Sequence, residues 1–207
     1  MKNNPQLGSP NPLVENYSGR VIDNHDCLDL GCGLGVNSLY LAQRGFRVTA
    51  VDQNARCLSA LQQEAKKAGL ENQIRIVQRN LAIKTIPRGK YSVVLAIDFL
   101  HFLQPKRCEK IMKIIKARTA QGGVVIAKAF LQTGTPLSPK QQRWLKLFSQ
   151  KAIDLLERKK FQRNELRDWF DDFDVIHYRE FTVDASGKED PLEVQHYGVA
   201  EIVAVKS

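Results

Sequence analysis

Leu28-Asp29-Leu30-Gly31-Cys32-Gly33-Leu34-Gly35 is the stretch that decides the fold of this 207-residue chain. It reads as an apolar strand that ends in three glycines at alternate positions, and a helical pattern follows over 36–44. A second strand over 47–51 is closed by Asp52. A strand, a glycine turn and a helix N-terminus together present backbone N–H groups to a ligand. The acid at the tip of the second strand is placed to accept hydrogen bonds from a ribose diol.

The spacing of the glycines separates two nucleotide-type ligands that use such a turn. A dinucleotide fingerprint, G-x-G-x-x-G, needs a glycine where this chain has Val36. A carboxylate at Asp29 would repel a pyrophosphate, whereas it attracts an ammonium group. S-adenosylmethionine carries an ammonium group, a sulfonium and an adenosine, but no phosphate. The turn therefore favours S-adenosylmethionine, and a turn that binds NAD or no ligand is the alternative.

The segment resembles motif I of the class I S-adenosylmethionine-dependent methyltransferases. Asp52 is expected on the ribose hydroxyls, with Gln53 beside the adenine. The resemblance implies that Asn80 accepts from the adenine amino group and that the backbone amide of Leu81 meets a ring nitrogen. A simple turn asparagine is the alternative for Asn80. The expected cofactor-binding residues are Asp29, Gly31, Cys32, Gly33, Asn37, Asp52, Gln53, Asn80, Leu81 and Ile97.

Polar residues that interrupt apolar strands are the candidates for acceptor chemistry. In an open α/β sheet, ligands bind beyond the carboxyl ends of the strands, so the segment after the fourth strand should face the transferable methyl group. Asp98 and His101 are its polar side chains, suited to orient or deprotonate a nucleophile. The alternatives are a turn cap and a satisfied loop histidine. His196 is a third catalytic candidate, and Tyr17 and Arg179 are substrate candidates.

Alternating strand and helix patterns predict a Rossmann-like, doubly wound, mostly parallel sheet in a three-layer α/β/α domain spanning 1–207. The last two strands predict an antiparallel C-terminal hairpin. Residues 1–20 are expected to be irregular apart from one helical turn, and a helix over 138–160 is expected to be a lid or substrate helix. The expected strands are 26–30, 47–51, 74–78, 91–97, 124–130, 173–183 and 194–205, and the other expected helices are 36–44, 55–68, 105–119 and 164–170.

Composition and charge narrow the partners and the cellular compartment that we expect for this chain. The net charge is +9, and Lys and Arg concentrate over 140–167. Such a face attracts nucleic acid or an anionic substrate, although a solvated helix surface is the simpler explanation. No apolar run approaches the ~18 residues that span a membrane, and the N-terminus lacks a signal-peptide pattern. Four scattered cysteines without metal-ligand spacing indicate reduced thiols in a cytoplasmic protein that has no metal site.

A narrower resemblance lies in residues 37–52, which look like the first βαβ unit of the tellurite-resistance methyltransferases and of related thiopurine-methyltransferase-like enzymes. Asn164-Glu165-Leu166-Arg167 and Asp184-Ala185-Ser186-Gly187 add to the likeness. It implies methylation of a small, soft nucleophile such as a thiol or a chalcogen oxyanion. The chain departs from the family at Val36, where an arginine is usual, and at Phe181-Thr182, where tellurite-type members carry a His-Arg pair.

Three functions compete on these observations. The first, which the sequence favours, is S-adenosylmethionine-dependent methyl transfer to a small molecule, with S-adenosylhomocysteine (SAH) as product. The sulfonium is already a strong electrophile, so the protein mainly aligns the nucleophile and excludes water. The second is a nucleic-acid-directed methyltransferase or RNA-binding module that uses the basic stretch 138–167. The third is a cofactor-binding protein without catalysis. A monomer and a homodimer fit equally.

Overall fold

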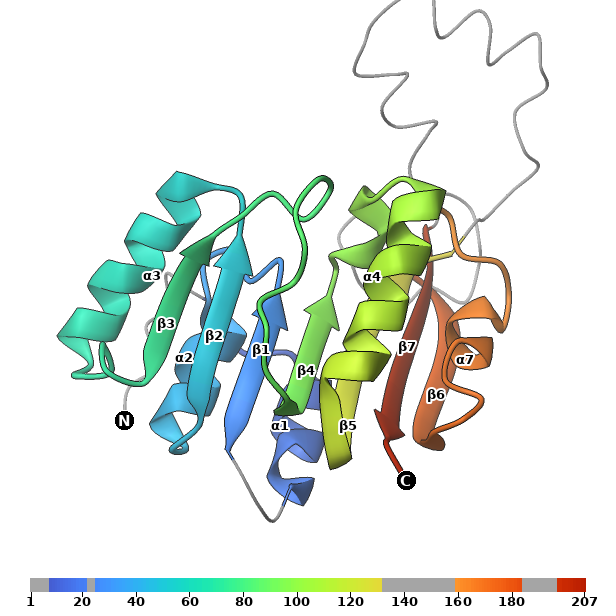
Figure 1. Cartoon of the computed structure of the whole chain (residues 1–207), viewed down its shortest axis with the longest axis horizontal. Coiled ribbons are helices and arrows are strands. Elements are labelled where there is room, and N and C mark those ends of the chain that lie inside the picture. Colours follow the sequence, from blue (N-terminus) through green and yellow to red (C-terminus); the bar gives the residue numbers. More distant parts are fainter. Residues whose placement is uncertain (1–7, 22–24, 132–158, 184–196) are drawn as a thin grey trace, which may run out of the picture.

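The computed structural model describes residues 8–21, 25–131, 159–183 and 197–207. It contains one seven-stranded sheet in the order β3-β2-β1-β4-β5-β7-β6 (Figure 1). The strands are β1 (Asp26–Leu30), β2 (Arg47–Asp52), β3 (Ile74–Gln78), β4 (Tyr91–Ile97), β5 (Thr119–Phe130), β6 (Asp174–Val183) and β7 (Tyr197–Val205). The helices are α1 (Pro12–Tyr17), α2 (Val36–Gln43), α3 (Ala55–Lys67), α4 (Pro105–Arg118) and α7 (Glu165–Asp168), with single 3-10 turns η1 (Ser18–Arg20) and η2 (Leu100–Phe102).

The direction of the strands determines where a ligand can bind. Strands β1 to β5 run parallel to one another, whereas β7 runs antiparallel to both β5 and β6. Residues 91–96 of β4 are buried, as expected of a strand covered on both faces. The order of the strands reverses between β1 and β4. In this kind of sheet, such a switch point opens a crevice at the carboxyl ends of the strands.

Helices cover both faces of the sheet and complete three layers. On one face α1, α2 and α3 bury Val14, Leu41 and Leu61 in a shared apolar cluster. On the other face α4 and α7 bury Ile111 and Leu166, and Figure 1 shows α4 lying along β5. Full burial of such a side chain contributes about 1.5–3 kcal/mol, so each helix is fixed to the sheet by its apolar stripe.

The expected fold class, parallel order and antiparallel hairpin are confirmed, and β1, β3 and β4 have the expected bounds. The predicted start of β5 was wrong, because α4 already ends at Arg118 and β5 begins at Thr119. The Thr119 hydroxyl donates to the Ile115 carbonyl at 2.8 Å, which satisfies the last turn of the helix without a glycine. Gly122-Gly123, between the predicted helix and strand, lies inside the strand.

Two further helix predictions need correction. The helix expected over 164–170 ends at Asp168, and Asn164 precedes it with a φ of 62°. Of the helix expected over 138–160, residues 138–158 lie outside the described residues, and Lys159 and Lys160 are not helical. Within the described ranges, no helix is long and apolar enough to cross a membrane.

The start of α2 depends on Gly35. This residue has a φ of 76°, and a Cβ atom there would lie 2.3 Å from Leu61 Cδ1. We expect Gly35→Ala to lower the free energy of unfolding by more than about 2 kcal/mol, because left-handed strain of roughly 1–2 kcal/mol adds to a collision in the core. Urea denaturation measures this loss.

Gly45→Ala is the matched control for Gly35→Ala. Gly45 has a φ of 86°, and a Cβ atom there would meet no atom within 4 Å. We therefore expect Gly45→Ala to show the backbone strain alone. Equal losses at the two positions would contradict the claim that Leu61 packs directly on the glycine turn.

Candidate cofactor and acceptor site

A cavity of about 320 Å³ opens at the carboxyl ends of β1, β2, β3 and β4, a size within the range of small-molecule pockets. It brings together six residues that the sequence singled out, from four separate segments: Gly31, Asp52, Gln53, Asn80, Leu81 and Asp98. The other residues of its wall are Val51, Asn54, Cys57, Arg79, Ala82, Phe99, Phe102 and Leu103.

Asp52 joins the two sides of the crevice. One carboxylate oxygen accepts a hydrogen bond from the Gly33 N–H at 3.0 Å, and the other accepts one from the Asn54 N–H at 2.8 Å. Asn54 in turn caps α3 by accepting from the Arg56 and Cys57 N–H groups. Each carboxylate oxygen can accept more than one hydrogen bond, so Asp52 retains capacity for a diol in the cavity.

The glycine turn is shaped by close approach on one side and open space on the other. Gly31 has a φ of 70°, and a Cβ atom there would lie 2.8 Å from the Phe99 ring, which also lines the cavity. Gly33 has a φ of 55°, and a Cβ atom there would meet nothing within 4 Å. The turn is anchored beneath, since the Gly31 and Cys32 N–H groups both donate to the Val51 carbonyl. The arrangement leaves room for a ligand against bare backbone at Gly33.

Asp29 lies behind the turn and is only 2% exposed. Its carboxylate accepts a hydrogen bond from the Ser38 hydroxyl at 2.7 Å. Burial raises the pKa of Asp29 to about 6; the Ser38 bond opposes this shift and the nearby Asp52 charge adds to it. Asp29 does not line the cavity, and its carboxylate lies beneath the turn.

The loop after β3 forms the opposite wall. The Asn80 side-chain oxygen accepts a hydrogen bond from the Ala82 N–H at 2.9 Å, and the Asn80 carbonyl accepts one from the Lys84 N–H at 2.9 Å. The asparagine therefore shapes its own turn, as one of the two sequence interpretations held. Asn80 and Leu81 both remain in the cavity wall.

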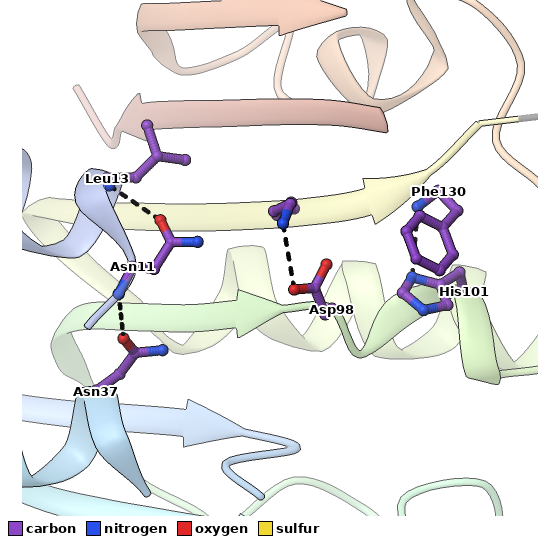
Figure 2. A network of polar contacts seen from close by, with 7 residues as sticks. Asn11, Leu13, Asn37, Asp98, His101 and Phe130 are labelled. Carbon is purple, nitrogen blue, oxygen red and sulfur yellow. Dashed lines mark hydrogen bonds and ion pairs between the residues drawn. The ribbon is translucent and has the colours of Figure 1, made fainter. Parts of the chain in front are cut away.

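Asp98 stands at the tip of β4 in a backbone conformation that non-glycine residues seldom adopt, with a φ of 51°. Its N–H donates to the Lys128 carbonyl at 2.9 Å, and its carboxylate pairs with the Lys128 ammonium at 3.4 Å (Figure 2). Strained residues of this kind cluster at functional sites, where neighbouring contacts hold them in place. Lys128 makes both contacts here.

His101 is buried on the turn that follows Asp98. Its Nδ1 atom accepts from the Phe130 N–H at 3.3 Å, and its ring stacks on the Phe130 ring with centroids 4.1 Å apart (Figure 2). Because one ring nitrogen is committed to the backbone of β5, the side chain ties the end of β4 to the end of β5.

The remaining candidates that the structure describes are not part of the cavity wall. Ile97 and Cys32 sit next to lining residues, and the Asn37 oxygen accepts from the Asn11 N–H at 2.9 Å (Figure 2). Tyr17 Oη lies 3.4 Å from His177 Nδ1. The Arg179 guanidinium lies over the Phe181 ring, and His196 is outside the described residues.

Sequence reasoning missed several wall residues. Phe99 and Phe102 lie in the segment after β4 that the sequence placed at the ligand, but only the polar residues of that segment were singled out. Cys57 and Arg79 had no such signal, because their inclusion depends on how α3 and the loop after β3 turn in space. In the part of the chain that the structure describes, no group of His, Cys, Asp and Glu side chains is arranged to hold a metal ion.

Comparison with known proteins places this geometry in a family. The family model of the tellurite resistance protein TehB matches residues 14–139, more than half of the chain. The chain belongs to the TehB family. A TehB of Haemophilus influenzae, named a probable S-adenosyl-L-methionine-dependent methyltransferase, is 28% identical over 163 residues, which cover 79% of this chain and 51% of that protein. This chain thus spans about half the length of the curated TehB proteins it matches.

Solved structures show the same fold. The crystal structure of TehB from Haemophilus influenzae has a TM-score of 0.72 and 24% identity, over 94% of this chain and 61% of that one. A coclaurine N-methyltransferase bound to N-methylheliamine and SAH has a TM-score of 0.69 and 14% identity, over 94% of this chain and 72% of that one. The TehB-like chain therefore has the Rossmann-like fold of class I methyltransferases.

The raised pKa of the buried Asp29 carboxyl makes the free energy of unfolding depend on pH. An acid whose pKa is higher in the folded state binds more protons there, so stability falls as the pH rises from about 4 to about 6 and is level above that. We expect the stability of Asp29→Asn relative to wild type to rise by about 2 kcal/mol between pH 4 and pH 7, because the neutral amide removes the buried charge.

Denaturation of both proteins across this pH range measures the effect. Ser38→Ala is the control with the opposite sign, because it removes the hydrogen bond that favours the charged carboxylate. Its stability relative to wild type should fall as the pH rises. A constant difference between Asp29→Asn and wild type would show that Asp29 titrates normally.

Proposed function

We propose that this TehB-family chain is an S-adenosylmethionine-dependent methyltransferase that acts on a small-molecule nucleophile. The observation that carries the proposal is the bridging position of Asp52. Its carboxylate holds the glycine turn and the start of α3 on either side of a cavity, with oxygen lone pairs left for a ribose. The names of the TehB relatives support the same activity.

The residues of the cavity fit the cofactor part by part. Asp52 and Gln53 are assigned to the ribose and the face of the adenine, and Asn80 and Leu81 to its edge. The bare backbone at Gly33 suits the amino-acid tail, with the buried Asp29 charge behind it favouring the ammonium group. When bound, S-adenosylmethionine supplies an electrophilic methyl group on its sulfonium.

We expect the acceptor beside Asp98, which lines the cavity just after the end of β4. Lys128 pairs with the Asp98 carboxylate and orients it, which suits it to accept a proton from an alcohol or amine. A thiol or a chalcogen oxyanion, the soft acceptors that the sequence suggested, needs little such help. His101 is proposed to position this segment, since its Nδ1 atom is occupied by Phe130. Tyr17, Arg179 and His196 stay predictions for the acceptor side.

Binding of SAH tests the cofactor assignment. We expect saturable binding by calorimetry, and an affinity reduced roughly 100-fold in Asp52→Ala, because two charge-assisted hydrogen bonds are lost from the crevice. Asp26→Ala is the matched control: this carboxylate is at the opposite end of β1, in an exposed pair with Arg47. Absence of SAH binding by wild type, or a preference for NAD, would refute the proposal.

The acceptor class is tested by comparing a thiol with an alcohol of similar shape. We expect Asp98→Asn to lower kcat less than tenfold with the thiol and more than tenfold with the alcohol, since general-base help is typically worth 10²–10⁴-fold where it is needed. His101→Gln serves as the comparison, and equal losses on both acceptors are expected there. Equal effects of Asp98→Asn on both acceptors would remove Asp98 from a proton-transfer role.

A further inference from the structure

The loop over 79–86 lies between β3 and β4, and its conformation must be held by contacts outside regular secondary structure. It contains no helix or strand, yet it supplies Arg79, Asn80, Leu81 and Ala82 to the cavity wall. A wall built from irregular backbone recognises a ligand only when its peptide groups are held in one orientation. The loop is held by the Arg79 N–H, which donates to the Asp52 carbonyl, by the burial of Leu81 and Ile86 in the core, and by one side chain outside the loop that reaches two of its carbonyl groups.

That side chain is Arg107, in the first turn of α4. Its Nε atom donates to the Leu81 carbonyl at 2.6 Å, and one terminal nitrogen donates to the Lys84 carbonyl. The guanidinium thus joins two carbonyl groups at either end of the turn. A planar fork with several donors bonds two acceptors at once, whereas the single ammonium of a lysine is a point donor on a flexible stem.

The peptide between Leu81 and Ala82 is held at both ends. Arg107 binds its carbonyl, and the Asn80 side chain binds its N–H at 2.9 Å. Because a peptide group is planar, these two bonds fix its orientation. The Leu81 N–H belongs to the preceding peptide group, whose Asn80 carbonyl accepts from the Lys84 N–H at 2.9 Å. Arg107 therefore reaches this group from two sides, through the Leu81 carbonyl and through Lys84. Among the described residues, the Leu81 N–H donates to no protein acceptor, so it is a backbone donor that this stretch of the wall can offer to a ligand.

The position of Arg107 in its own helix argues for a role outside that helix. The first turn of α4 contains Lys106 and Arg107 and no acidic residue. Cations are disfavoured at a helix N-terminus, where the macrodipole is positive, by about 0.3–1 kcal/mol each. The helix therefore gains nothing from a charge here, whereas the loop gains two hydrogen bonds.

We propose that Arg107 is a positioning residue that fixes the Leu81 N–H against the acceptor nitrogen N1 of the adenine, and so makes the site selective for adenine. The inference rests on the proposed function, since it assumes that the adenosine part of the cofactor occupies this cavity. Arg107 acts through the loop and does not touch the base.

The test compares SAH with S-inosylhomocysteine, in which N1 carries a hydrogen and donates instead of accepting. By calorimetry we expect wild type to prefer SAH more than tenfold, because two donors would otherwise face each other at a desolvated position. We expect Arg107→Ala to bind SAH at least tenfold more weakly and to lose most of this preference. Its kcat at saturating cofactor should change less than twofold.

Two variants separate this role from general destabilisation. Arg107→Lys keeps the charge and the stem and is expected to fold, yet it should also lose the preference, because one ammonium cannot hold both carbonyls. Lys106→Ala removes the neighbouring exposed cation and should retain both the affinity and the preference. If wild type binds SAH selectively and Arg107→Lys and Arg107→Ala do so equally, the inference is overturned. If wild type does not bind SAH at all, the proposed function fails first.

Discussion

The two hydrogen bonds that Asp52 accepts are the constraint on which the rest of the site depends. They connect the Gly33 N–H, in the turn after β1, with the Asn54 N–H, at the start of α3. The end of the first strand and the end of the second are thereby fixed relative to each other at the switch point of the sheet. Both oxygens of the carboxylate are used structurally, and Asp52 also lines the cavity, where a diol can add to the same network. One residue therefore shapes the crevice and offers it to a ligand.

Several residues around Asp52 have environments or backbone conformations that lower the stability of the fold. Asp29 is a buried acid with a raised pKa, and Asp98 has a left-handed backbone conformation. A Cβ atom at Gly31 would collide with Phe99, and one at Gly35 would collide with Leu61. Natural proteins tolerate such strain where binding or chemistry requires it, and the surrounding apolar clusters supply the stability that these positions lose.

The two ends of the crevice are built differently. The end proposed to bind the cofactor is made of three short turns, after β1, β2 and β3, which are held by Asp52, Asn54 and Asn80. The end proposed for the acceptor is made of contacts between distant segments, such as Asp98 with Lys128 and His101 with Phe130. Backbone geometry of the first kind follows from short local segments. Contacts of the second kind depend on how neighbouring strands end, and they are where substrate preference can change without loss of the fold.

The sequence by itself determined the strand, glycine turn and helix pattern that begins at β1, because this pattern depends on residues within a few positions of one another. It placed β1, β3 and β4 correctly for the same reason. The end of α4, the clamp of Arg107 on the Leu81 carbonyl and the stacking of His101 on Phe130 were decided only by the tertiary structure. The contacts of Arg107 and His101 join groups that are many residues apart, and a side-chain hydrogen bond ends α4 in place of a glycine. No periodicity or spacing records such contacts, since they arise when the sheet brings the strand ends together.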